Sequence, residues 1–246
     1  MIKVTDLDKY FKKRHVLKNI NFEVKKGETL VIIGASGSGK STLLKLLIGL
    51  IQPDKGRIFI DGEEISHMSE EELDQVRLKM GMVFQYSALF DSMSVGDNVG
   101  FGLREHSRLG EDEIQRIIKE KLKMVELEGF ENYMPNELSG GMKKRVSLAR
   151  AIAFEPAILL YDEPSSGLDP ITSARIDELI VQMQKVLGVT SIVVTHDMKS
   201  AFYIADRIAM IYEGEIIAIG TPDEIRCSAD ARVQEFIDVS RIRKRG

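Results

Sequence analysis

The chain has 246 residues, 43% of them hydrophobic, which is enough for one substantial domain with a smaller subdomain. Its 34 basic and 38 acidic residues give a formal net charge of -4, which excludes the whole-chain basic excess of a nucleic-acid-binding protein. A single cysteine, Cys227, excludes an internal disulfide and suits a reducing compartment. No run approaches the roughly eighteen apolar residues that span a bilayer, so a membrane role requires a partner chain.

The amino-terminal part predicts antiparallel strands. Apolar residues alternate over 2–7 and 16–24, on either side of a basic turn. Tyr10 and Phe11 lie between these segments, where an aromatic ring can stack on a nucleobase. On spacing alone, a buried position in the core is an equally good interpretation for either residue.

A glycine-rich motif at 34–42 follows an apolar run at 30–33 and precedes leucines that recur at helical spacing from Leu43 to Leu50 and predict a helix. It fits the phosphate-binding pattern G-x-x-x-x-G-K-[ST] at every fixed position, and we call it the phosphate loop. Its residues are Gly34, Ala35, Ser36, Gly37, Ser38, Gly39, Lys40, Ser41 and Thr42. Glycines let backbone N–H groups turn toward a polyphosphate, and the dipole of the following helix favours the same negative charge. We expect Lys40 to reach the outer phosphates, Ser41 to bind a magnesium ion and Thr42 to meet the inner phosphate.

The alternative for this motif is a glycine-rich turn that only ends a strand. A strand pattern before it and a helix pattern after it disfavour that reading.

Two more strands and a helix are predicted after the phosphate loop. The residues 57–60 read as a strand, and a capping box at Ser69 opens a short helix through Met80. The apolar run at 81–84 predicts another strand, which ends on Gln85.

Strand signals vanish between 86 and 155. The segment is charged, with a clear amphipathic pattern from Glu111 to Leu127 and a last helix over 142–154. We therefore expect a helical subdomain, 86–155, inserted into an α/β core.

The remaining segments predict a mostly parallel sheet. Apolar runs at 157–161 and 191–195 are separated by a helical pattern at 176–187. The residues 208–219 read as a hairpin, and a helical tail begins at Pro222. A basic run at its end, 241–245, is read as a solvated tail, with contact to acidic lipid or a partner as the alternative.

Two acidic residues, Asp162 and Glu163, directly follow the apolar run at 157–161. A carboxylate at the end of a strand can hold a magnesium ion, and its neighbour can accept the proton of an attacking water. The alternative of two solvent-facing acids does not explain why both follow five apolar residues and precede a proline.

Six motifs in one order resemble the ATP-binding cassette family of transporter ATPases. They are the phosphate loop, Gln85 as the Q-loop, Leu138-Ser139-Gly140-Gly141-Met142 as the signature motif, 158–163 as the second nucleotide motif, 166–169 as the D-loop and His196 as the switch histidine. Taken alone, Gln85 could be a strand terminus, the glycine pair a helix start and His196 a core histidine. The resemblance implies one P-loop NTPase (RecA-like) domain over 1–246, with an amino-terminal antiparallel subdomain and the signature motif on the inserted helical subdomain.

The resemblance implies ATP and Mg²⁺ as cofactors and assigns each motif a role. These roles are phosphate binding by 34–42 with Lys40, magnesium binding by Ser41, Gln85 and Asp162, activation of water by Glu163, contact with the terminal phosphate by His196, and stacking on adenine by Phe11 in preference to Tyr10. It also implies a head-to-tail homodimer in which Ser139, Gly140 and Gly141 of one copy cover the ATP held by the other.

The signature motif departs from the commonest pattern at Met142, where most cassettes carry Gln, and continues as Lys143-Lys144-Arg145. With this departure the chain resembles the cassette ATPases of the Mla phospholipid-transport system and related Mce-type lipid importers. That resemblance implies phospholipid movement between inner and outer membranes, driven from the cytoplasmic face of the inner membrane. The implied partners are an MlaE-type permease and an Mce-domain protein, and a STAS-domain regulator is suggested as a third.

Other cassette ATPases remain as alternatives. A subunit for lipoprotein release or cell division has the same chemistry with other partners, and Met142 argues mildly against it. A soluble cassette acting on nucleic acid or ribosomes is disfavoured by the single set of motifs, the lack of a heptad run and the lack of basic excess. We expect no nucleic-acid partner.

Overall fold

The computed structural model describes residues 1–242, with side chains described through Asp238. The chain divides into two compact units, one joining Met1–Arg77 to Val189–Gly246 and the other formed by Leu78–Gly188. They are called the first and second unit below. The basic run predicted as a tail, 241–245, lies outside the residues whose side chains are described.

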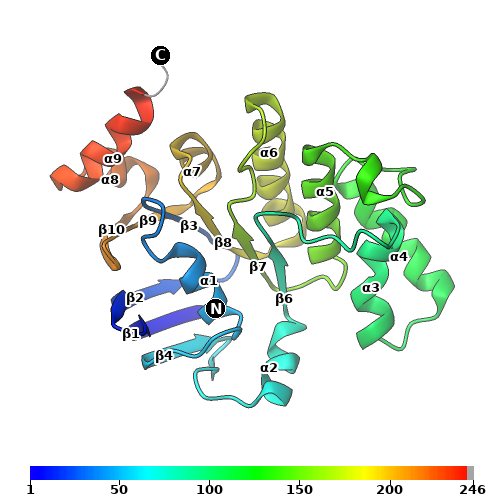
Figure 1. Cartoon of the computed structure of the whole chain (residues 1–246), viewed down its shortest axis with the longest axis horizontal. Coiled ribbons are helices and arrows are strands. Elements are labelled where there is room, and N and C mark those ends of the chain that lie inside the picture. The colour runs from blue at the N-terminus through cyan, green and yellow to red at the C-terminus, as the bar shows by residue number, and fades with distance from the viewer. Residues whose placement is uncertain (243–246) are drawn as a thin grey trace. The chain divides into compact units, whose positions relative to one another are not determined.

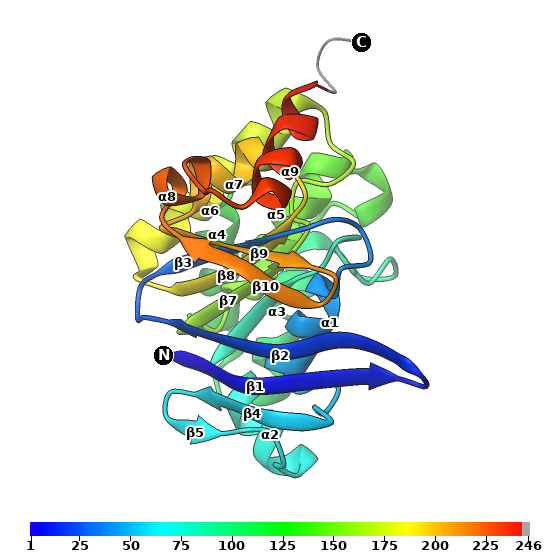
Figure 2. The same ribbon diagram turned by 90° about the vertical axis from the view of Figure 1, so that its left-hand side faces the viewer.

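The first unit contains an antiparallel sheet in the order β2, β1, β4, β5, whose strands lie side by side in Figure 2. Its strands are β1 (Ile2–Phe11), β2 (Arg14–Val24), β4 (Lys55–Ile60) and β5 (Glu63–Glu64). The apolar residues of the alternating pattern are buried, among them Ile2, Val4 and Leu7. The predicted antiparallel strands are confirmed, and they extend further than the pattern indicated, up to the turn at Lys12.

The first unit also contains parallel strands, with β3 paired to β8 on one side and to β9 on the other. The strand β10 forms an antiparallel hairpin with β9. The bounds are β3 (Thr29–Ile33), β8 (Thr190–Thr195), β9 (Arg207–Tyr212) and β10 (Glu215–Gly220). All residues of β3 and β8 are buried, as expected of parallel strands whose faces are covered.

The helices of the first unit are α1 (Lys40–Leu47), α2 (Glu70–Arg77), α7 (Met198–Ile204), α8 (Pro222–Arg226) and α9 (Ala231–Ile242). Two predicted helix ends are wrong. The helix α1 stops at Leu47, and Leu50 is 52% exposed rather than packed. The helix α2 keeps its predicted capping box but ends at Arg77, because Met80 already belongs to the next strand.

The second unit pairs β6 (Met80–Val83) in parallel with β7 (Ile158–Asp162). Its α-helices, labelled in Figure 1, are α3 (Val95–His106), α4 (Glu111–Met124), α5 (Gly140–Ala151) and α6 (Pro170–Leu187), and a short 3-10 helix, η1 (Pro135–Glu137), precedes α5. Every residue between 86 and 155 is described and none is in a strand, as the loss of strand signals predicted. The bounds of the inserted subdomain stay a prediction.

The start of α6 differs from the prediction. The helix begins at Pro170, six residues before the predicted 176, because the Asp169 carboxylate caps it by accepting bonds from the backbone N–H groups of Ile171 and Thr172. In the described part of the chain no helix is long and apolar enough to cross a membrane.

Candidate active site

The phosphate loop connects β3 to α1 in the first unit. Gly34 has a φ of +153°, and a Cβ on it would lie 2.3 Å from the carbonyl oxygen of Ile211. A side chain at this position would therefore force the loop away from the end of β9. The loop takes its shape from backbone packing that requires a glycine.

The end of the loop is the amino terminus of α1. Its N-cap is Gly39, so no side chain caps this helix end, in contrast to α3, α5, α6, α7 and α8. Lys40 is only 6% exposed, and its ammonium donates to the carbonyl oxygens of Gly34 at 2.8 Å and Ala35 at 3.2 Å. The Ser38 hydroxyl is buried without a hydrogen-bond partner among the described residues. A positive helix end, an ammonium held within the loop and an unsatisfied hydroxyl fit a bound polyphosphate.

His196 lies at the same end of the sheet as the phosphate loop. Thr195 at the end of β8 pairs with Ile33 at the end of β3, so the next residues, His196 and Gly34, follow neighbouring strand ends. Asp197 accepts a bond from the backbone N–H of Lys199 and caps α7, which keeps the turn after His196 short. The carboxyl ends of parallel strands are the usual ligand side of such a sheet.

The two amino-terminal aromatics differ in their surroundings. The Tyr10 ring stacks on His15 with centroids 4.0 Å apart, whereas Phe11 at the end of β1 is 47% exposed. The β1–β2 hairpin also contacts the phosphate loop, because the Arg14 guanidinium donates to the Gly37 carbonyl at 3.4 Å. These contacts favour Phe11 over Tyr10 for stacking on adenine.

The second unit holds the acidic residues at the end of a parallel strand pair. Asp162 is the last residue of β7, and Glu163 follows it with a φ of +48° and only 9% exposure. Val83 at the end of β6 pairs with Tyr161, so Gln85, two residues further on, lies at the same edge as the carboxylates. The structure therefore brings Gln85, Asp162 and Glu163 to one edge of the strand pair.

A buried lysine, which the sequence did not mark as functional, lies at this edge. Lys144 of α5 is 5% exposed, and its ammonium donates to the backbone carbonyls of Gln85 and Glu163. Burial lowers its pKa, against the opposing effect of Asp162 and Glu163. The signal in the sequence is the basic run Lys143-Lys144-Arg145, which directly follows Met142, the residue at which the signature motif departs from the family pattern.

The signature motif opens α5. Ser139 is exposed and caps the helix, its hydroxyl accepting from the Met142 N–H at 3.3 Å. Gly140 is also exposed, while Gly141 packs so closely on α6 that a Cβ would lie 2.3 Å from the Thr172 methyl group. The signature residues therefore stand beside the start of α6, at the end of the D-loop.

The predicted magnesium ligands are divided between the units, with Ser41 in the first and Gln85 and Asp162 in the second. A hydroxyl, an amide oxygen and one carboxylate are the oxygen ligands that Mg²⁺ takes alongside phosphate oxygens and water, so the donor set fits the ion. Among the described side chains, no group of three or more His, Cys, Asp or Glu residues could hold a metal ion.

Comparisons with known proteins agree with these motifs. The family model described as "ABC transporter" matches residues 17–166. The chain is 46% identical over 224 residues to the intermembrane phospholipid transport system ATP-binding protein MlaF of Haemophilus influenzae, covering 91% of this chain and 85% of that protein. It is 40% identical over 241 residues to the probable ribonucleotide transport ATP-binding protein mkl of Mycobacterium tuberculosis, covering 98% of this chain and 67% of that protein.

A solved structure gives the same result for the fold. The dimeric ATP-binding cassette MJ0796, in a post-hydrolysis state bound to ADP and Pi, matches with a TM-score of 0.84 and 36% identity. The match covers 90% of this chain and 99% of that one. The predicted resemblance is confirmed: the chain belongs to the ABC transporter family and is an ATPase subunit of that family.

Proposed function

We propose that the chain is the ATP-hydrolysing subunit of an ABC transporter that moves phospholipid between the inner and outer membranes through an MlaE-type permease. The observation that carries this proposal is the 46% identity to an MlaF protein over 91% of the chain. It acts peripherally, on the cytoplasmic face of the inner membrane. Its further partners are an Mce-domain protein and a STAS-domain regulator.

The chemistry follows from the residues of each unit. The backbone N–H groups of the phosphate loop, the amino terminus of α1 and Lys40 bind the phosphates, and His196 contacts the terminal one. The Glu163 carboxylate accepts a proton from a water that attacks the γ-phosphorus. The bond from that phosphorus to the β–γ bridging oxygen breaks, and ADP and phosphate are formed. Ser41, Gln85 and Asp162 would hold Mg²⁺, which would supply positive charge to neutralise the phosphates.

A head-to-tail homodimer completes each site in this proposal. The exposed Ser139 and Gly140 at the amino terminus of α5 offer N–H groups and a positive helix end to the terminal phosphate held by the second copy. The dimeric state of the MJ0796 cassette supports this arrangement.

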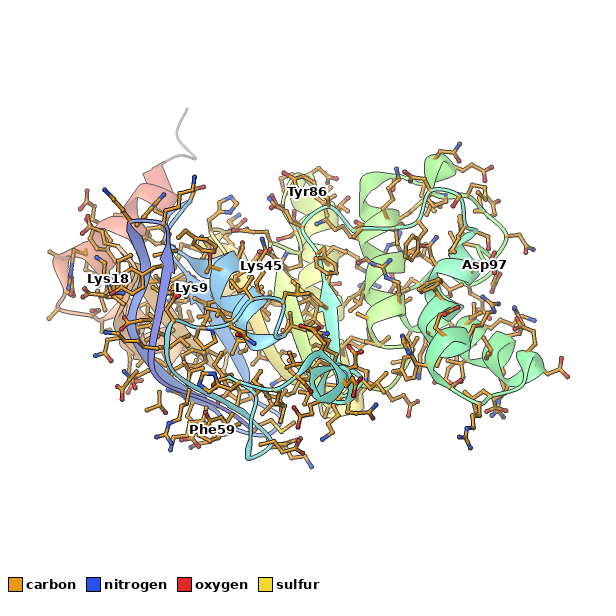
Figure 3. All side chains as sticks on the ribbon, turned by 60° about the horizontal axis from the view of Figure 1, so that its bottom comes forward. Lys9, Lys18, Lys45, Phe59, Tyr86 and Asp97 are labelled. Carbon is orange, nitrogen blue, oxygen red and sulfur yellow. The ribbon has the colours of Figure 1, made fainter. Side chains whose placement is uncertain are left out.

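The permease is proposed to contact the loop after β6. Tyr86, labelled in Figure 3, is 87% exposed, and Phe90 further along the loop is 43% exposed. Exposed aromatics on a loop next to a proposed magnesium ligand suit a docking surface whose contacts change with the nucleotide state.

Purification of the native complex from membranes tests this proposal. We expect the chain to copurify with an MlaE-like permease, and the complex to hydrolyse ATP and carry labelled phospholipid between vesicles of inner- and outer-membrane composition. Transport of ribonucleotide, as in the name of the mycobacterial relative, would contradict the phospholipid proposal. A lipoprotein-release or cell-division permease in the complex would contradict the MlaE-type partner, and a complex with RNA or ribosomes and no permease would contradict the transporter role.

A further inference from the structure

The loop after β6 is held by the helix that carries the signature motif. Ser139 caps α5, and five residues later Lys144 donates to the Gln85 carbonyl at the start of that loop. Six residues further along the helix, the Arg150 guanidinium donates to the carbonyls of Ser87 at 2.9 Å and Ala88 at 2.7 Å. One helix therefore fixes the loop on both sides of the exposed Tyr86.

Lys144 differs from Arg150 because its second contact is with another segment, the residues after β7. Its ammonium also lies 3.4 Å from the carbonyl oxygen of Glu163. That carbonyl accepts a bond from the N–H of Ser166 as well, at 3.1 Å. The backbone of Glu163 is left-handed, with a φ of +48°, a conformation that a non-glycine residue keeps only where its surroundings hold it.

Burying an ammonium group that connects a helix to two loops carries a large desolvation cost. Removing a cation from water costs several kcal/mol unless hydrogen bonds and nearby negative charge offset the loss. Lys144 is 5% exposed and its neighbours include the carboxylates of Asp162 and Glu163. The charge is therefore placed beside the residues to which the proposed function assigns magnesium binding and water activation.

We infer that Lys144 is a positioning residue for ATP hydrolysis: from helix α5 it fixes the backbone of Gln85 and of Glu163, so that both side chains keep the orientation that hydrolysis requires. This inference rests on the proposed ATPase function. It also links the chemistry to the dimer, because the same helix presents Ser139 to the second copy. When α5 moves on dimer closure, the Lys144 side chain therefore moves the backbone of both Gln85 and Glu163.

Lys144→Met, compared with Lys143→Met, tests the inference in the full-length protein. Lys143 precedes it on α5 and is only half-buried, so it provides a matched loss of charge. For Lys144→Met we expect a fall in kcat of roughly tenfold or more, since small misplacements of catalytic groups carry costs of this size. The KM for ATP and the affinity for a non-hydrolysable ATP analogue should stay within about twofold of native, because the phosphate loop belongs to the other unit. Lys143→Met should keep native kcat.

Hydrogen–deuterium exchange supplies a readout that needs no hydrolysis. In Lys144→Met, without nucleotide, we expect faster exchange in peptides covering 85–88 and 163–166, with the Lys143→Met variant unchanged. Should Lys144→Met fail to fold, Lys144→Gln replaces it with the same expectations. Native kcat in the folded variant, or equal losses of kcat and ATP affinity, would overturn the inference. A native protein that does not hydrolyse ATP would instead overturn the proposed function.

Discussion

The two units hold their parts of the site by different means. In the first unit the phosphate loop is shaped by backbone packing, as Gly34 against the Ile211 carbonyl shows, and its lysine bonds to the carbonyls of the loop itself. In the second unit the loop after β6 is held by side chains from two helices. Lys144 and Arg150 reach it from α5, and Asn98 reaches it from α3.

Asn98 shows how complete this side-chain support is. It is fully buried, and its amide oxygen accepts a bond from the Phe90 N–H at 2.8 Å. Its amide nitrogen donates to the carbonyls of Phe90, Met93 and Ser94 at 3.0 to 3.1 Å. The loop after β6 therefore depends on side chains that a single substitution can remove. The phosphate loop depends instead on the absence of a side chain at Gly34, so an added Cβ there disturbs it.

We expect this structural difference to separate effects on nucleotide binding from effects on the rate of ATP hydrolysis. Substitutions in the first unit should mainly change the affinity for nucleotide, and substitutions in the second should mainly change kcat with the affinity preserved. Single substitutions in each unit test this division.

The largest effect is expected for Glu163→Gln in the second unit. The amide cannot accept the proton of the attacking water, and a general base contributes roughly 10²- to 10⁴-fold, so kcat should fall by that factor. Steady-state hydrolysis and equilibrium binding of ATP measure the two quantities separately. ATP affinity should stay native, and the surface variant Glu128→Gln, at a residue 68% exposed, should keep native turnover. Normal hydrolysis in Glu163→Gln would show that Glu163 is not the general base.

Gly34→Ala should give the next largest effect, this time on binding. The added Cβ would meet the Ile211 carbonyl at 2.3 Å and must displace the loop. Because this displacement moves the backbone N–H groups that bind the phosphates, we expect nucleotide affinity to fall by roughly a hundredfold, about 2.7 kcal/mol, in a calorimetric titration. Gly110→Ala is the control, since it has a φ of -72° and a Cβ there would meet nothing within 4 Å. Native affinity in Gly34→Ala would show that the backbone packing is not decisive.

The sequence predicted the first of these two regions better than the second. The phosphate loop and the buried strands depend on local patterns, namely glycines in one motif and continuous apolar runs. Lys144 was not recognised as a functional residue, because its contacts with Gln85 and Glu163 are 59 and 19 residues away in the chain. No periodicity in the sequence reports such a long-range contact.

Helix boundaries were missed where capping decided them. No helical pattern in the sequence predicts α7, since its seven residues from Met198 to Ile204 are too short for one. Its start is set by the Asp197 side chain, as the start of α6 is set by Asp169. The roles of the individual site residues stay predictions.

Asn98→Ala should weaken the second unit without weakening ATP binding. The backbone groups of Phe90 and Met93 would lose their partner, and a buried polar group left unsatisfied costs about 1–3 kcal/mol. We expect the free energy of unfolding to fall by about 2–3 kcal/mol in urea denaturation, with kcat reduced and ATP affinity close to native. The exposed Asn136→Ala should leave both unchanged. A loss of affinity comparable to the loss of kcat would break the division between the units.

Phe11→Ala should give the smallest effect, because here the first unit contributes a side chain rather than backbone. Base–aromatic stacking is worth about 1–3 kcal/mol, and the 47% exposure of Phe11 places it at the lower end, so ATP affinity should fall about fivefold. Competition against a fluorescent ATP analogue measures the change, and kcat at saturating ATP should stay native. Tyr10→Ala is the matched control, since its ring already stacks on His15. A larger loss in Tyr10→Ala would transfer the stacking role to Tyr10. A loss in Phe11→Ala near that of Gly34→Ala would mean that an aromatic side chain, and not the backbone of the loop, dominates nucleotide binding in the first unit.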